Sequence, residues 1–329
     1  MRPSNTDCAN SSGRTAEVVL WVVVPCYNEE AVLPQTMARL EGLVGEMAAC
    51  GAVSSRSRIV YVDDCSDDGT WGLISRAHER SGLHCGLRIG VNSGQQAALM
   101  AGLEASVEEA DCVVTVDADL QDDISVVPQM VGYYREGYEV VYGVRSDRSR
   151  DMVLKRWTAQ AFYRLLQWLG CRTVYNHADF RLMGRRAVQE LTLYGERTLF
   201  LRGIVPLMGF RSTTVSYERG VREAGTTKYS LGKMTALALH GITSLSVSPI
   251  RLISLFGLLF MLIAAGVAVW VVWCMAEGRN VPGWVSLMLS MWFIGGSILG
   301  ALGLIGEYIG NISLDVKHRP RYRIEERLI

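Results

Sequence analysis

The sequence is short of charge and has no excess of either sign. Charged residues make up 20% of the 329 residues, and 33 Lys and Arg balance 33 Asp and Glu. Soluble domains carry about 25% charge, so this low share, together with a mean hydropathy of +0.17, predicts a membrane-embedded part. The composition excludes a chain that is disordered throughout. The zero balance argues against a general nucleic-acid binder, which would show a basic excess.

Several motifs are absent as well. No two of the eight cysteines have CxxC spacing, and the five histidines form neither HxxxH nor HExxH. A zinc ribbon, a redox dithiol and a His-based metal site are therefore not indicated. The two common glycine-rich phosphate loops, GxGxxG after the first strand and GxxxxGK[ST], are also missing. Residues 1–16 lack the apolar core of a signal peptide, so we expect a disordered tail followed by a domain in the cytoplasm.

Residues 17–230 have the pattern of an α/β domain. Apolar, β-branched runs that end in polar residues are typical of buried parallel strands, and helical segments separate them. Strands are predicted at Val18–Val24, Arg58–Val62, Cys112–Val116 and Glu139–Val144. Helices are predicted at Glu29–Met47, Gly94–Val107, Ser125–Arg135 and Lys155–Leu169. The alternation favours a mainly parallel sheet with helices on its faces.

Polar clusters follow three of the predicted strands. They are PCYNE from Pro25, DDCSDDGT from Asp63 and DADLQDD from Asp117. Ligands of parallel sheets bind beyond the carboxyl ends of the strands, so we expect the three clusters to form one site. The DxD pair at Asp117 and Asp119 offers oxygen ligands of the kind that Mg²⁺ and Mn²⁺ prefer. A solvated turn has the same pattern, and the pair at Asp63 either caps a helix or faces a nucleobase N–H.

The motifs together resemble a known family. VVVPCYNEE, YVDDCSDDGT and VDADLQDD resemble the opening motifs of inverting glycosyltransferase family 2, whose fold is the Rossmann-like GT-A fold. HADFRLMGRRAV, RTLFLRGIVPLMGF and YERGVREAGTTKYSLGKM are similar to its polyprenyl-phosphate group, which includes bactoprenol glucosyltransferases and dolichyl-phosphate mannose synthases. The resemblance covers about residues 18–320. It implies metal-dependent transfer of one sugar, glucose, from UDP-glucose to undecaprenyl phosphate with inversion.

The resemblance also assigns roles to residues. The nucleotide pocket would be lined by Pro25, Tyr27, Glu29, Asp63 and Asp64, and the metal and diphosphate would be held by Asp117, Asp119 and Gln121. Asp179 matches the position of the catalytic carboxylate. The cations near the donor and acceptor phosphates would be Arg145, Arg202, Arg222 and Lys228. Other interpretations stay open, because each arginine could be a solvated charge and Asp179 could be a helix cap or the buried partner of Arg181.

The end of the chain predicts a membrane anchor. Within residues 250–310, two segments at about 252–275 and 283–306 lack charged residues and exceed the roughly 20 apolar residues of a spanning helix. Residues 231–249 are predicted as an amphipathic interfacial helix, with a core helix of the soluble domain as the alternative. Basic residues in the tail at 311–329 place it in the cytoplasm by the positive-inside rule. We therefore expect a multi-pass protein of the inner or plasma membrane with both termini cytoplasmic.

Four glycines in and just after the second apolar segment form two GxxxG pairs, which allow close helix contacts within the chain or in a homo-oligomer. They are Gly296, Gly300, Gly306 and Gly310. Three alternative functions remain. The first is a GDP-mannose-dependent mannose synthase. The second is a processive polysaccharide synthase, but Val153 stands where the glutamine of its QxxRW motif would precede Arg156. The third is an inactive membrane scaffold.

Overall fold

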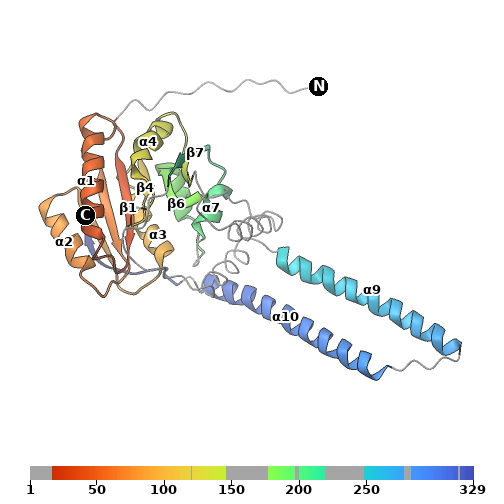
Figure 1. Ribbon diagram of the computed structural model, residues 1–329. Helices are drawn as coiled ribbons and strands as arrows, with labels where there is room; N and C mark the ends of the chain where they lie inside the picture. Colours follow the sequence, from red (N-terminus) through yellow and green to blue (C-terminus); the bar gives the residue numbers. More distant parts are fainter. Residues whose placement is uncertain are drawn as a thin grey trace, which may run out of the picture. The chain divides into compact units, whose positions relative to one another are not determined.

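The computed structural model describes residues 17–119, 121–145, 177–196, 200–218, 248–277, 283–317 and 319–329 (Figure 1). The chain divides into two compact units. The first unit comprises Met1–Arg164, Arg172–Tyr229 and Arg319–Ile329, and it contains the whole β-sheet. The second unit comprises Leu165–Cys171 and Ser230–His318, and it contains two long helices.

The first unit is built on one eight-stranded sheet with the order β7-β5-β6-β4-β1-β2-β3-β8. The strands are β1 (Leu20–Cys26), β2 (Arg58–Asp63), β3 (His84–Ile89), β4 (Cys112–Thr115), β5 (Val140–Arg145), β6 (His177–Gly184), β7 (Ser212–Tyr217) and β8 (Ile324–Leu328). β1 is parallel to its neighbours β4 and β2, and β2 is parallel to β3. Antiparallel β6 lies between β4 and β5, and β7 runs parallel to β5. The predicted α/β fold with a mainly parallel sheet is confirmed.

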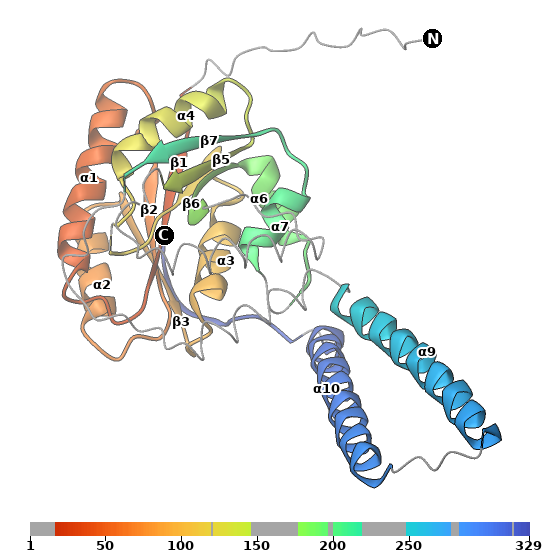
Figure 2. The ribbon, with the colours of Figure 1, turned by 45° about the vertical axis from the view of Figure 1, so that its right-hand side comes forward.

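Helices cover both faces of this sheet (Figure 2). They are α1 (Leu33–Ala49), α2 (Thr70–Arg80), α3 (Gln95–Ser106), the 3-10 turn η1 (Ile124–Val126), α4 (Val127–Arg135), α6 (Arg185–Thr192) and α7 (Leu201–Leu207). Successive side chains of a strand face opposite sides. Val22 and Val24 of β1 therefore join the core under α1, α2 and α4, while Val23 faces α3. A Cβ atom on Gly102 of α3 would lie 2.3 Å from Cγ1 of Val23, so this glycine allows α3 to sit close to the sheet.

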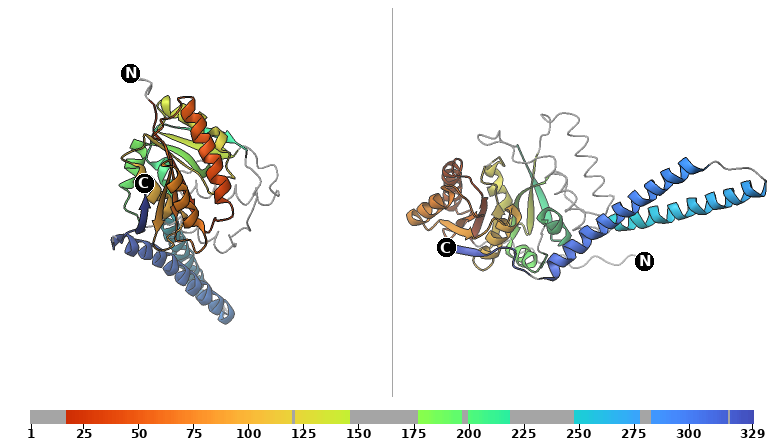
Figure 3. Two further views of the ribbon diagram at one scale, coloured as in Figure 1. Left: turned by 90° about the vertical axis from the view of Figure 1, so that its left-hand side faces the viewer. Right: turned by 90° about the horizontal axis from the view of Figure 1, so that it is seen from below.

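The end of the chain adds the edge strand β8 (Figure 3). β8 pairs antiparallel with β3, with Leu328 opposite Gly86, and Trp71 Nε1 of α2 donates to Glu326 Oε2 over 3.0 Å. The separate basic tail that was expected over residues 311–329 is wrong in its last part, because residues 324–328 form a strand of the first unit's sheet. The sequence IEERL does not show the pattern of a strand, because its three central charged residues are exposed and only its two ends are half-buried. Pairing covers the backbone groups that β3 would otherwise expose at the edge.

The second unit contains α9 (Ser248–Ala276) and α10 (Trp284–Val316). At a rise of about 1.5 Å per residue, both are longer than the roughly 30 Å hydrocarbon core of a bilayer. Within the residues that the structure describes, one segment, Phe293–Val316, meets the length and apolarity expected of a spanning helix. Phe260 of α9 and Phe293 of α10 contact edge to face, with ring centroids 5.4 Å apart. The two predicted spans stay a prediction, and α10 continues past the expected end at residue 306.

Four predicted strands correspond to β1, β2, β4 and β5, and three predicted helices correspond to α1, α3 and α4 with its preceding turn. The predicted helix Lys155–Leu169 lies outside the described residues, as does the predicted interfacial helix except for its last two residues, which begin α9. The strands β3, β6 and β7 were not singled out in the sequence.

Candidate active site

The first two polar clusters are joined by hydrogen bonds of their backbone. Asn28 has a positive φ of 53°, and its N–H donates to Ser66 Oγ over 2.9 Å. Its side-chain oxygen accepts from Asp67 N over 2.9 Å, and Glu29 N donates to Thr70 Oγ1 over 3.0 Å. These bonds fix the loop after β1 against the loop after β2. Pro25 lies buried within β1, whereas Tyr27 is 38% exposed at the end of the strand.

The neighbouring carboxylates Asp63 and Asp64 have different surroundings. Asp64 accepts hydrogen bonds from Ser93 N (2.7 Å) and Gly94 N (2.8 Å), so it fixes the loop before α3. Gly94 has a φ of +90°, which favours glycine at that position. Asp63 is fully buried, its Oδ2 lies 3.8 Å from Arg88 Nε, and its Oδ1 has no hydrogen-bond partner among the described residues. Burial raises the pKa of both carboxyl groups.

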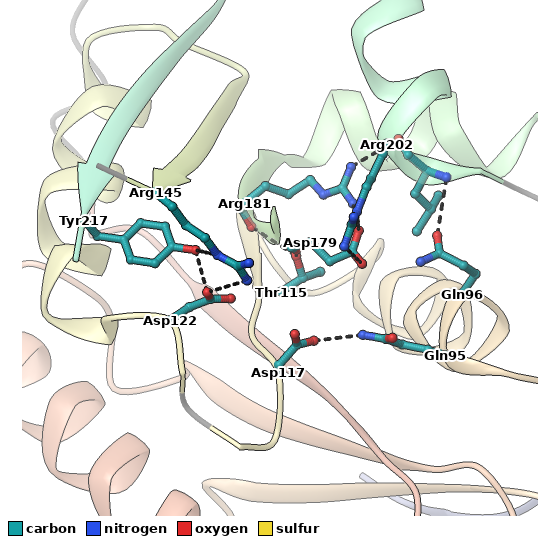
Figure 4. Close-up of polar contacts among 11 residues, drawn as sticks. Gln95, Gln96, Thr115, Asp117, Asp122, Arg145, Asp179, Arg181, Arg202 and Tyr217 are labelled. Atoms are coloured by element: carbon teal, nitrogen blue, oxygen red, sulfur yellow. Dashed lines mark hydrogen bonds and ion pairs between the residues drawn. The ribbon is translucent and has the colours of Figure 1, made fainter. Parts of the chain in front are cut away.

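The DxD pair lies on the loop after β4. Gln95 Nε2, at the start of α3, donates to Asp117 Oδ1 over 2.8 Å (Figure 4). Asp119 Oδ1 accepts from the backbone N–H of Gln121 over 3.3 Å, and the Gln121 side chain is buried. Burial raises the pKa of Asp117 to about 7, and the negative charges of Asp179, Asp122 and Asp119 add to this shift. A bound cation would relieve the same repulsion.

The donor atoms of this loop fit a hard divalent cation. Asp117, Asp119 and Gln121 all offer oxygen, which Mg²⁺ and Mn²⁺ prefer. Across the described parts of the chain, no group of three His, Cys, Asp or Glu side chains is arranged to hold a metal by itself. An ion here would therefore complete its shell with water and with oxygens of a diphosphate, as Mg²⁺ commonly does in sites that bind phosphates.

A second group of polar side chains connects the DxD loop to strands β5 and β7 at one edge of the sheet. The Asp122 side chain is only 1% exposed, and its Oδ1 accepts from Arg145 Nη2 of β5 over 3.2 Å. Tyr217 of β7 donates its hydroxyl to the same oxygen, and Arg145 Nε donates to the Tyr217 hydroxyl over 3.3 Å. Arg145 was expected near a phosphate, and in this structure it contacts the loop that carries the expected metal ligands. Asp122 and Tyr217 had no assigned role in the sequence.

Asp179 of β6 lies between two arginines (Figure 4). Arg202 of α7 makes a bidentate contact, from Nε to Oδ1 over 3.0 Å and from Nη2 to Oδ2 over 2.9 Å. Arg181 Nη2 donates to Oδ1 over 2.9 Å. Arg181 is fully buried, and its desolvation lowers the pKa of its guanidinium while the charge of Asp179 opposes that effect. The ion pair with Arg181, which was one interpretation of the sequence, is therefore present.

Two glutamines complete the described part of the site. Gln96 Oε1 accepts from the backbone N–H of Leu201 over 3.3 Å, and Gln95 contacts Asp117 as described above. Both glutamines belong to the segment VNSGQQ, which follows β3, and because that strand was not predicted, nothing in the sequence indicated their role. Arg222 and Lys228, which were predicted to bind phosphate, lie outside the described residues.

The site thus combines three chemical properties. Crowded carboxylates on one loop fit a cation, and with it a diphosphate. Guanidinium groups near Asp179 fit a second anion. The buried Asp63, one oxygen of which accepts no hydrogen bond from the described residues, offers an acceptor for an N–H group. Such a combination suits the transfer of a group between two phosphorylated molecules.

The sequence and the fold were compared with known proteins. Residues 21–192 match the family model described as glycosyl transferase family 2. The chain is 47% identical to the uncharacterized glycosyltransferase YkoT of Bacillus subtilis (strain 168), over 95% of this chain and 93% of that protein. It is 37% identical to the bactoprenol glucosyl transferase of Shigella phage SfX, over 93% of this chain and 98% of the relative.

A prophage bactoprenol glucosyl transferase homolog of Escherichia coli (strain K12) is 36% identical, over 92% of this chain and 97% of that protein. Among solved structures, a mannosyltransferase from Pyrobaculum calidifontis in complex with GDP-Man and Mn²⁺ aligns with a TM-score of 0.45. That alignment has 18% identity and covers 92% of this chain and 86% of the other.

Proposed function

The chain belongs to glycosyl transferase family 2 and is a glycosyltransferase, and we propose that it transfers one glucose from UDP-glucose to undecaprenyl phosphate or a related polyprenyl phosphate. The product is a lipid-linked sugar with an inverted anomeric centre, formed at the cytoplasmic face of the membrane. The relatives at 36% and 37% identity that are named bactoprenol glucosyl transferases support the acceptor class.

One observation carries the proposal. Asp117 of the DxD loop lies beside the bidentate ion pair of Asp179 and Arg202 (Figure 4). A cation-bound diphosphate and an acceptor phosphate would therefore bind side by side. In the reaction, an oxygen of the acceptor phosphate attacks the anomeric carbon, the bond from that carbon to the diphosphate oxygen breaks, and the electron pair leaves with the diphosphate.

The residues divide into a donor side and an acceptor side. On the donor side, Asp63 accepts from a nucleobase N–H, and Tyr27 and Glu29 border the same pocket. Asp117, Asp119 and Gln121 would hold Mg²⁺ or Mn²⁺, which would supply Lewis-acid stabilisation of the leaving diphosphate. On the acceptor side, Arg202 binds the phosphate, and we assign Arg222 and Lys228 to the same anion on the basis of the resemblance alone.

The helices of the second unit suit a lipid acceptor. Apolar side chains along α9 and α10 are exposed, among them Leu259, Trp270 and Ile298. We propose that both helices span the membrane and that the chain ends return to the cytoplasm, where Lys317, Arg319 and Arg323 meet the positive-inside rule. A membrane-anchored enzyme reaches a polyprenyl phosphate without extracting its tail from the bilayer.

The test uses the full chain purified in detergent and returned to lipid nanodiscs. Undecaprenyl phosphate, Mg²⁺ or Mn²⁺, and one radiolabelled donor at a time (UDP-glucose, other UDP-sugars, GDP-mannose) are supplied, and the labelled lipid is extracted. We expect glucose transfer that depends on metal and is lost in Asp119→Asn, which keeps the size of the side chain but removes its charge. Transfer from GDP-mannose in preference to UDP-glucose would contradict the donor. No labelled lipid with any donor, or full activity in Asp119→Asn, would contradict the function.

A further inference from the structure

We propose that Asp179 is a positioning residue that presents Arg202 to the acceptor phosphate, and that it does not remove a proton from the acceptor. This inference rests on the proposed function and deepens it, because it states which residue binds the acceptor phosphate and which residue positions it. A general base needs a lone pair directed at the group that loses the proton. Three of the roughly four lone-pair positions of the Asp179 carboxylate are directed at guanidinium groups instead.

Both oxygens of Asp179 accept from guanidinium groups. Oδ1 accepts from Arg181 and Arg202, and Oδ2 accepts from Arg202, at distances of 2.9 to 3.0 Å. The side chain is 5% exposed, whereas that of Arg202 is 41% exposed. The carboxylate is therefore the buried support, and the arginine is the group that reaches the solvent-facing side. A proton on Oδ1 would displace one of these bonds, and a proton on either oxygen would remove the negative charge that pairs with both guanidinium groups.

Arg181 holds the same arrangement from the buried interior of the unit. Its Nη2 binds Asp179, and its Nη1 donates to the backbone carbonyl of Leu201 over 3.1 Å. Leu201 directly precedes Arg202 at the start of α7, so one fully buried guanidinium holds both the carboxylate and the helix that carries Arg202. The Thr115 hydroxyl of β4 donates to the backbone carbonyl of Asp179, which fixes the strand as well. Such support from several elements is typical of a preorganised binding group.

The charge of this group suits a phosphate that is already ionised. Two guanidiniums and one carboxylate leave a net positive charge, and an arginine held by a bidentate pair has a defined orientation. A phosphate monoester loses its second proton at a pKa of about 6, so at neutral pH most of the acceptor carries two negative charges. Its oxygen forms the new bond to the anomeric carbon while the diphosphate leaves, and no proton has to be transferred.

The two roles predict different kinetics for Asp179→Asn. If Asp179 positions Arg202, the KM for polyprenyl phosphate rises about tenfold or more, as expected when a charge-assisted hydrogen bond is weakened, and the KM for the donor stays within about twofold. The defect persists at pH 9, where the acceptor is fully ionised. If Asp179 is a base, kcat falls by about a hundredfold or more, and the variant recovers at pH 9 because no proton remains to be removed.

Arg202→Gln provides the second variant, and its partly exposed side chain makes a folded product expected. It should reproduce the rise in acceptor KM, and the double variant with Asp179→Asn should be no worse than either single variant, because the two residues act as one unit. An unchanged acceptor KM in Arg202→Gln, additive losses in the double variant, or recovery of Asp179→Asn at pH 9 would each overturn the inference.

The controls separate this inference from the function on which it rests. The wild-type chain is measured first, and absence of transfer there contradicts the proposed function. Every variant is tested for UDP binding by calorimetry in the presence of Mn²⁺, which reports an intact donor side. An Asp179→Asn protein that does not bind UDP is set aside as misfolded, and Arg202→Gln then decides the question by its acceptor KM.

Discussion

Tyr217, in the edge strand β7, donates its hydroxyl to Asp122, which lies in the loop that follows β4. The two residues are 95 positions apart in the chain. Asp122 is three residues from Asp119 and one from Gln121, so the hydrogen bond fixes the loop that carries the proposed metal ligands. Burial and the charge of Asp122 both raise the pKa of Tyr217, which keeps the hydroxyl protonated and able to donate.

Replacement of Tyr217 by phenylalanine should loosen this loop. The change removes one hydroxyl and leaves a buried carboxylate with one donor fewer, which costs about 1–3 kcal/mol. We expect a melting temperature lower by about 2–12 °C in a unit of this size and weaker Mn²⁺-dependent binding of UDP in calorimetry. Tyr133→Phe on α4 is the matched control, because its half-buried ring contacts Tyr138 and that ring contact is kept. Equal UDP affinity in wild type and Tyr217→Phe would contradict the assigned role.

The raised pKa of Asp117 predicts that binding of a divalent cation depends on pH. The pKa in the fold, about 7, lies above the ordinary value of about 3.9, so the metal-free fold binds a proton that the unfolded chain has lost. The contribution of Asp117 to the stability of the metal-free fold is therefore highest at low pH, and it is lost as the pH rises through 7. A cation replaces the proton, so stabilisation by Mn²⁺ should be small at pH 6 and clearly larger at pH 8.

Thermal unfolding of the full chain with and without Mn²⁺ at the two pH values measures this effect. Asp117→Asn cannot ionise, so its metal-free melting temperature should lack the decline that this group causes, and Mn²⁺ should stabilise it little at either pH. A Mn²⁺-induced shift of equal size at pH 6 and pH 8 in the wild-type protein would show that Asp117 is not coupled to the cation.

The sequence predicted the strands that are apolar runs and missed β6, whose charges are paired. β1, β2, β4 and β5 are apolar runs, and such runs are recognisable without tertiary structure. β6 carries Asp179 and Arg181, which are usually exposed residue types, yet here they are buried as an ion pair. The strand therefore has no continuous apolar run. Its role becomes visible only when α7 brings Arg202 against it.

The candidate site shows the same division. Asp117 and Asp119 were predicted because the DxD pattern is local and follows a strand. Asp122 and Tyr217 were not, since their relationship depends on the order of strands in the sheet. The separate surroundings of Asp63 and Asp64 were also beyond prediction, because the hydrogen bonds to Asp64 come from the loop before α3.

The C-terminal strand predicts that a short truncation destabilises the domain. Removal of residues 324–329 exposes the edge of β3 and breaks the bond between Trp71 and Glu326. At about 1 kcal/mol for each lost backbone hydrogen bond, we expect a loss of several kcal/mol and faster amide hydrogen exchange in β3. Glu326→Gln keeps an oxygen for Trp71 and should change stability by less than about 1 kcal/mol, as for other exposed charges. Unchanged exchange in β3 after truncation would show that β8 contributes little.

Two glycines on helices give opposite predictions for the same substitution. Gly102→Ala places a Cβ atom 2.3 Å from Cγ1 of Val23 in the core strand β1, so α3 or the strand must move. Overpacking of this kind costs about 1–3 kcal/mol. A shift of α3 would also move Gln95, whose amide contacts Asp117, so we expect lower Mn²⁺-dependent UDP affinity along with a lower melting temperature.

Gly42→Ala in α1 is the matched control, since a Cβ atom there meets nothing within 4 Å and alanine favours a helix interior by about 0.5–1 kcal/mol over glycine. The Gly42 variant should melt slightly higher than wild type and bind UDP equally well. A Gly102→Ala protein as stable as the Gly42→Ala protein would mean that α3 adjusts without cost, and the close approach of α3 to β1 would then not be what places Gln95 beside Asp117.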